Sequence, residues 1–243
     1  MRKKWGSLWT AILLAVLFLL GAVLVILHLD SAKTVLAEQN SLPLVIIDPG
    51  HGGMDGGAIG TDGQVEKEIN LSIALKLRDM LESNGITTLM TRESDVSIHD
   101  QGCETVREQK TSDLKNRLKL MNEASDAVFV SIHQNKYTSS SAKGAQVFYS
   151  TNREESKLLA EILQKNLTEM LQPENTRVIK PGTKALFLLY KAEKPAVLIE
   201  CGFLSNYEEA KRLSGTEYQE QLAFSIFCSL LQYLDNSQSP ADM

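Results

Sequence analysis

The stretch LVIIDPGHGGMDGGAIGTDGQVEKEINLSIALKLRDML, residues 44–81, decides how this chain folds and where its site lies. Its first apolar residues are typical of a buried strand, and the apolar positions after residue 68 recur at helical spacing up to a glycine stop at Gly85. A glycine-rich loop lies between strand and helix, with His51 near its start and Glu66 at its end. We expect these glycines to let the backbone bring His51 and Glu66 to one metal ion.

The rest of the chain alternates short apolar runs with amphipathic stretches. Further strands are predicted over 86–91, 127–133, 145–150 and 196–203, and further helices over 112–125, 153–171 and 217–234. Strands that alternate with helices indicate an α/β fold, a single domain with a mostly parallel (mixed) sheet flanked by helices. Functional residues in such sheets gather at the carboxyl ends of the strands.

The N-terminal part differs in kind. Basic residues at positions 2–4 precede an uncharged run over 5–27, which is long enough for a transmembrane helix. The basic end is expected to stay in the cytoplasm, so the remainder is extracytoplasmic and membrane-anchored through this helix. Cleavage as a signal peptide after Ala37 is the alternative and would leave a secreted protein. The predicted segments are a cytoplasmic basic end (1–7), a transmembrane anchor or signal sequence (8–28), a linker (29–41), a catalytic domain (42–236) and a C-terminal tail (237–243).

Charge and cysteine content narrow the classes of function. The chain has 25 basic and 30 acidic residues, and its formal net charge of −5 becomes about −8 without the basic residues at 2–4. This balance argues against nucleic acid as a ligand, because phosphate binding needs a basic face. The three cysteines are odd in number and have no paired spacing, so they predict no disulfide framework. We expect Cys201 to be structural, since no free base is placed to activate its thiol.

Three predicted strands end in a residue that can bind a metal or work beside one. His51 follows the first strand, His133 ends the third, and Glu200 lies toward the end of the last. Two imidazoles and the Glu66 carboxylate are enough to hold Zn²⁺ and leave a fourth position open. Glu200 would then be placed to act as a base. The alternatives are that each histidine is structural and that Glu66 merely favours the helix N-terminus through the helix dipole.

Taken in order, the sequence motifs resemble a known family. They are IIDPGHGGMDGGAIG, EKEINL, TRESD, NRLKLMN, SDAVFVSIHQN, GAQVFY and PAVLIECGFLSN, and the match spans about residues 44–234. This series resembles the zinc-dependent N-acetylmuramoyl-L-alanine amidases of the bacterial cell wall, the amidase-3 group. The resemblance implies that His51, Glu66 and His133 hold one Zn²⁺ per chain and that Glu200 is the catalytic residue. It favours Glu66 over the nearby Glu68.

The resemblance also implies a reaction and a partner. The reaction is hydrolysis of the amide between the lactyl group of N-acetylmuramic acid and L-alanine, and the partner is a peptidoglycan glycan strand with its stem peptide. The layout is similar to that of the sporulation- and germination-specific amidases that prepare spore-cortex peptidoglycan for muramic-δ-lactam formation. The alternatives are a zinc peptidase that cleaves within the stem peptide and a non-catalytic peptidoglycan-binding regulator. An amidase that needs an activating protein partner would resemble the regulator in vitro.

Residues 97–112 form a polar insertion between the motifs TRESD and NRLKLMN. Such a segment is expected to be a solvated surface loop. The alternatives are that it borders the substrate groove or that it docks a partner.

Overall fold

The computed structural model describes residues 19–25 and 42–238. The chain divides into two compact units, 1–41 and 42–243, and in the first unit residues 19–25 are helical. Among the helices of the two described ranges, none combines the length and the apolar composition that a membrane span requires. The transmembrane segment predicted over 8–28 lies mostly outside those ranges, and the linker predicted over 29–41 lies entirely outside them.

The second unit is built around one six-stranded sheet with the strand order β2-β1-β3-β6-β4-β5. Strands β2, β1, β3 and β6 are parallel, whereas β4 runs antiparallel to β6 and parallel to β5. The mostly parallel, mixed sheet predicted from the sequence is therefore confirmed. Strand β4 reverses direction because residues 136–145 contain no crossover helix. The strands are β1 (Leu44–Pro49), β2 (Thr88–Met90), β3 (Ala127–Asn135), β4 (Gln146–Tyr149), β5 (Lys180–Pro181) and β6 (Ala196–Phe203).

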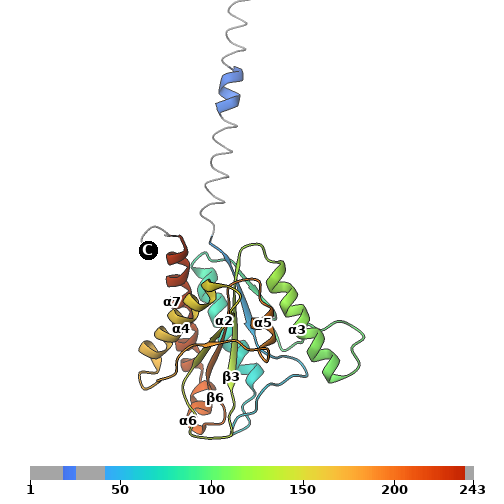
Figure 1. Cartoon of the computed structure of the whole chain (residues 1–243), viewed down its shortest axis with the longest axis vertical. Coiled ribbons are helices and arrows are strands. Elements are labelled where there is room, and N and C mark those ends of the chain that lie inside the picture. Colours follow the sequence, from blue (N-terminus) through green and yellow to red (C-terminus); the bar gives the residue numbers. More distant parts are fainter. Residues whose placement is uncertain (1–18, 26–41, 239–243) are drawn as a thin grey trace, which may run out of the picture. The chain divides into compact units, whose positions relative to one another are not determined.

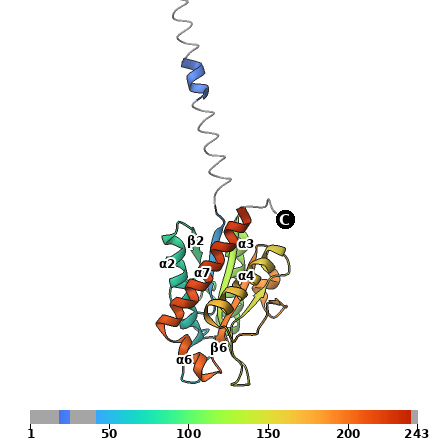
Figure 2. The same ribbon diagram turned by 90° about the vertical axis from the view of Figure 1, so that its left-hand side faces the viewer.

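Helices cover both faces of this sheet (Figure 1). On one face lie α2 (Glu66–Ser83), α4 (Glu154–Leu171) and α7 (Thr216–Gln238), with α7 packed against both of the others (Figure 2). On the other face lie α3 (Val106–Glu123) and the short α5 (Phe187–Lys191) (Figure 1). The remaining helix, α6 (Tyr207–Leu213), follows β6 directly.

Alternation along the strands divides the core into two clusters. In β1, Val45 and Ile47 belong to the cluster under α2, α4 and α7, while Ile46 belongs to the cluster that contains Met121 of α3 and Leu188 of α5. Because β1 and β3 are buried on both faces, they read as continuous apolar runs in the sequence. Polar residues lie at the carboxyl ends of these strands.

The segment 97–112 differs from the loop that its composition predicts. Helix α3 begins at Val106, so the end of the segment is helical. The Thr105 side chain accepts a hydrogen bond from the Glu108 backbone, and the Glu108 side chain accepts one from the Thr105 backbone. This capping box satisfies two free donors of the first turn and starts the helix early. Strand β5 and helices α5 and α6 are further elements that periodicity did not predict, because each is too short to show a period.

Candidate metal centre

The three predicted metal ligands come together at the carboxyl end of the sheet. His51 follows β1, Glu66 is the first residue of α2, and His133 lies near the end of β3. Their candidate ligand atoms all lie within 4.8 Å of one another. His51 Nε2 is 3.2 Å and His133 Nδ1 is 3.0 Å from the same oxygen, Glu66 Oε1. The two imidazole rings meet edge to face, with centroids 5.0 Å apart.

Glu66 is held in one orientation by several donors. Its Oε2 accepts a hydrogen bond from the Ala58 amide at 2.7 Å, and its Oε1 accepts one from the Gln134 amide at 3.0 Å. The Asn70 side chain donates to Oε1 at 3.3 Å. Glu66 is buried, whereas Glu68 is exposed. The start of α2 therefore decides which of the two carboxylates faces the histidines.

The charges at this centre favour a cation. Burial alone would lower the pKa of His51, but hydrogen bonds to Asp55 and Glu66 outweigh it and raise the pKa to about 9. Burial alone would raise the pKa of Glu66, but the hydrogen bonds from His133 and His51 hold it well below its ordinary value. A position that stabilises extra positive charge between two imidazoles and a carboxylate suits a divalent metal ion.

Asp55 fixes the orientation of the His51 ring through the ring nitrogen Nδ1. Asp55 Oδ2 lies 2.9 Å from His51 Nδ1, so the second ring nitrogen, Nε2, faces Glu66. A carboxylate behind a histidine ligand fixes the ring orientation and raises its basicity. Asp55 is in turn paired with Lys110 of α3 at 2.8 Å.

Two buried arginines hold the backbone that carries His51. His51 has a left-handed backbone with φ of 64°, a conformation that costs energy for a residue with a side chain. Arg117 Nη2 donates to the His51 carbonyl oxygen at 2.7 Å, and Arg117 Nη1 donates to that of Pro49 at 3.0 Å. Arg92 donates to the carbonyl oxygens of Pro49 and Gly50, each at 3.0 Å. These bonds stabilise the strained turn from which His51 points at Glu66.

Two glycines allow the close approach of the ligands. A Cβ added to Gly50 would lie 2.2 Å from His133 Cε1, and one added to Gly57 would lie 2.5 Å from Glu66 Oε2. Gly57 also has a positive φ of 70°. A residue with a side chain at either position would displace a ligand.

We expect Gly57→Ala to lower the zinc affinity by about 10- to 100-fold, the range seen when the surroundings of a metal ligand are disturbed. The matched control is Gly63→Ala, because Gly63 has a similar positive φ of 82° but has no atom within 4 Å of an added Cβ. Zinc titration against a competing chelator measures both affinities. Equal affinities for the two variants would contradict the close packing of Gly57 against Glu66.

Glu200 lies beside His133 on the neighbouring strand. The two residues are register partners across β3 and β6, so their side chains point to the same face of the sheet. Glu200 Oε2 is buried and has no hydrogen-bond partner within residues 42–238. Burial raises the pKa of Glu200 to about 7, against the lowering effect of the nearby His133. An unpartnered carboxylate oxygen at this position is free to exchange a proton with a bound water or substrate.

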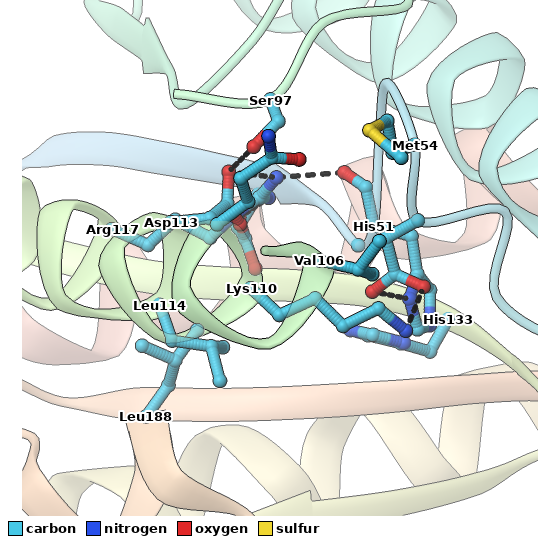
Figure 3. A pocket seen from close by; sticks show the side chains of 14 residues that line it. His51, Met54, Ser97, Val106, Lys110, Asp113, Leu114, Arg117, His133 and Leu188 are labelled. Atoms are coloured by element: carbon cyan, nitrogen blue, oxygen red, sulfur yellow. Dashed lines mark hydrogen bonds and ion pairs between the residues drawn. The ribbon is translucent and has the colours of Figure 1, made fainter. Parts of the chain in front are cut away.

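A cavity adjoins the two histidines on the α3 side of the sheet (Figure 3). Its volume is about 160 Å³. Ser97, Val106, Gln109 and Lys110 line it, and all four belong to the segment 97–112. The Lys110 side chain extends toward His51 and His133 (Figure 3). The segment therefore borders the candidate site, one of the two alternatives to a solvated loop.

Sequence reasoning missed several residues that shape this centre. In the sequence Asp55 is one polar residue of a glycine-rich loop, and no local pattern marks Arg92 or Arg117 as residues of the site. Lys110 lies in the insertion, where the Thr105–Glu108 capping box was the local signal for a helix start. Cys201, by contrast, is completely buried, and burial raises the pKa of its thiol to about 12. It is therefore unsuited to act as a nucleophile at neutral pH.

The chain belongs to the N-acetylmuramoyl-L-alanine amidase family, whose model (Amidase_3) matches residues 45–232, and it is an enzyme of that class. The resemblance predicted from the motifs is thereby confirmed. The match begins in β1 and ends in α7, so it covers the whole sheet and every residue of the centre described above.

Individual relatives agree with the family match. A germination-specific N-acetylmuramoyl-L-alanine amidase of Bacillus subtilis (strain 168) is 37% identical over 206 residues, which are 83% of this chain and 86% of that protein. The CwlD amidase from Clostridioides difficile, solved in complex with the GerS lipoprotein, is 40% identical with a TM-score of 0.76, over 79% of this chain and 98% of that one. An N-acetylmuramoyl-L-alanine amidase from Clostridium difficile 630 is 32% identical with a TM-score of 0.70, over 81% and 98% of the two chains.

Proposed function

We propose that the chain hydrolyses the amide between the lactyl group of N-acetylmuramic acid and L-alanine of the stem peptide. It would do so with one Zn²⁺ held by His51, Glu66 and His133. The observation that carries this proposal is the convergence of the three donors beside Glu200, whose Oε2 has no partner among the described residues. Two imidazole nitrogens and one carboxylate oxygen are one of the donor sets found in catalytic zinc sites. The Asp55 and Glu66 carboxylates, which favour positive charge at this position, and the glycines that make room for the ligands support the same fit.

Each residue of the site has a separate role in the proposed reaction. Bound zinc would polarise the amide carbonyl and make water more acidic. Glu200 accepts a proton from the attacking water and delivers it to the leaving amine of L-alanine. Asp55 keeps the His51 ring oriented, while Arg117 and Arg92 keep its backbone in place. No covalent bond between enzyme and substrate is needed.

Digestion of purified peptidoglycan tests this proposal. We expect the zinc-loaded chain to release stem peptides with a free L-alanine amino terminus and to leave muramic acid without peptide, as read by mass spectrometry. Removal of the metal with a chelator is expected to abolish release, and one equivalent of zinc to restore it. Cuts elsewhere in the stem peptide would instead indicate a peptidase. Zinc binding without any cut, with a partner supplied, would indicate a regulator.

We extend the proposal to the spore cortex and to a protein partner. The germination-specific relative supports a role in spore-cortex maturation, with muramic-δ-lactam formation as the outcome, and the CwlD–GerS structure supports a lipoprotein as the activating partner. Both roles imply an enzyme that acts outside the cytoplasm, because peptidoglycan lies there. Muropeptide analysis of spores that lack the chain tests the cortex role, and co-purification tests the lipoprotein. Unchanged lactam content would refute the cortex role.

A further inference from the structure

A second hollow lies on the opposite side of Glu200 from the metal centre. Strand pairing places His133 beside Glu200, and Glu200 beside Gln146. Register partners point to the same face of a sheet, so the three side chains form a row across β3, β6 and β4. Gln146 lines a hollow of about 540 Å³. The hollow therefore begins one strand beyond the proposed catalytic residue.

This hollow is lined by two cations and by no acidic side chain. The cations are Arg177 and Lys180, and the other lining residues are uncharged. The Arg177 guanidinium lies over the Phe203 ring at 4.5 Å, and its Nη1 donates to Gln146 Oε1 at 3.3 Å. Neither cation is within ion-pair distance of a carboxylate in the described part of the chain. Because acidic residues outnumber basic ones in this protein, two unpaired cations in one hollow point to an anionic ligand.

The chemistry of the substrate identifies that anion, and this step rests on the proposed function. The carboxyl group of the muramoyl lactyl ether is tied up in the amide that is cut, whereas the departing peptide carries free carboxylates. Neighbouring strands are about 4.8 Å apart, so Gln146, the partner of Arg177, lies one strand (about 5 Å) from Glu200, and Lys180 lies two strands across and two residues back along the sheet, about 12 Å away. An extended peptide covers about 3.4 Å per residue. The two cations are therefore within reach of the second and third residues of the stem, counted from L-alanine.

We propose that Arg177 and Lys180 bind a carboxylate on the second or third residue of the stem peptide. Arg177 is pre-oriented by Phe203 and Gln146, whereas the Lys180 side chain forms no hydrogen bond or ion pair with described residues and can follow the ligand. This contact places the leaving amine of L-alanine beside Glu200. The hollow is thus the part of the site that selects the peptide.

Two synthetic substrates test the assignment. Both are N-acetylmuramoyl tripeptides that begin with L-alanine, and they differ only in whether the second and third residues carry carboxylates or carboxamides. We expect the zinc-loaded enzyme to prefer the carboxylate form by about 10-fold in kcat/KM, through KM, as suits charge-assisted hydrogen bonds. The double variant Arg177→Gln/Lys180→Gln is expected to lose this preference. Lys180→Gln alone is expected to lose a few-fold, because its side chain is exposed.

The controls separate charge recognition from other effects. Lys157→Gln on α4 changes the net charge as much as Lys180→Gln does, but Lys157 lies in an exposed ion pair with Glu161, so this variant is expected to keep the preference. Arg177→Lys keeps the charge and is expected to keep most of the preference for the carboxylate substrate. Equal cleavage of both substrates by parent and variants would overturn the carboxylate site while leaving the amidase function intact. If Arg177→Gln lost kcat/KM equally for both substrates while Lys180→Gln had the parental kcat/KM, Arg177 would have a structural role. That result would also overturn the carboxylate site. Failure of the parent to cleave or bind either substrate, with the lipoprotein partner supplied, would instead refute the proposed function.

Discussion

Glu200→Gln is expected to lower kcat by about 10²- to 10⁴-fold, the usual cost of removing a general acid/base. Glutamine keeps the size of the side chain but cannot accept a proton. The position supports this role because Glu200 lies beside His133 across the β3–β6 pair and its Oε2 has no partner among the described residues. Substrate binding should change little, since the lost step belongs to the transition state.

The measurement is the release of stem peptide with a free L-alanine amino terminus, together with the zinc content of the variant. Glu220→Gln on α7 is the matched control, because it makes the same chemical change at an exposed position and is expected to leave the rate at the parental value. A Glu200→Gln protein that cleaves at the parental rate would contradict the mechanism. One that loses its zinc would show that Glu200 is a metal ligand.

Arg117→Met is expected to lower the free energy of unfolding by about 3–5 kcal/mol, because it leaves the Asp48 carboxylate buried without its cation. Arg117 is 2% exposed and Asp48 is 1% exposed, and Arg117 Nη1 lies 2.6 Å from Asp48 Oδ1. The variant also loses the bond to the His51 carbonyl oxygen. We therefore expect weaker zinc binding at temperatures where the variant is still folded.

Denaturant unfolding of a double-mutant cycle tests this expectation. Asp48→Asn combined with Arg117→Met removes both charges, so the double variant should be more stable than the sum of the two single effects implies. Additive effects would show that the two side chains do not interact. The hydroxyls of Thr91 and Ser131 also donate to Asp48 in the parent, and both residues are kept unchanged throughout the cycle.

The pH dependence gives an independent check on the same pair. Burial raises the pKa of Asp48, but Arg117 and the hydroxyls of Ser131 and Thr91 lower it below the ordinary value of 3.8. The pair therefore stabilises the fold above that value and loses its effect as the pH falls through the folded-state pKa. The loss in free energy of unfolding caused by Arg117→Met should become smaller at acidic pH, because Asp48 can then bind a proton.

Much of the fold was predictable because it depends on local patterns. Apolar runs located β1, β3 and β6, and helical spacing located α2, α4 and α7. The site was predictable to the extent that its residues lie at the ends of strands, where chain order already assigns an edge of the sheet. The early start of α3 also has a local signal, the Thr105–Glu108 capping box. The polar composition of 97–112 nevertheless favoured the prediction of a loop.

The sequence by itself determined the class of fold, the family, and the candidate residues His51, Glu66, His133 and Glu200. Only the tertiary structure decided which side chains support them. Arg117 reaches Asp48 across 69 positions of sequence, and Arg177 meets Gln146 across 31. Periodicity reports which face of an element is buried, but it does not report which element packs against that face or where a long side chain ends. Those contacts follow from how the sheet and helices stack, and that stacking is a property of the whole chain.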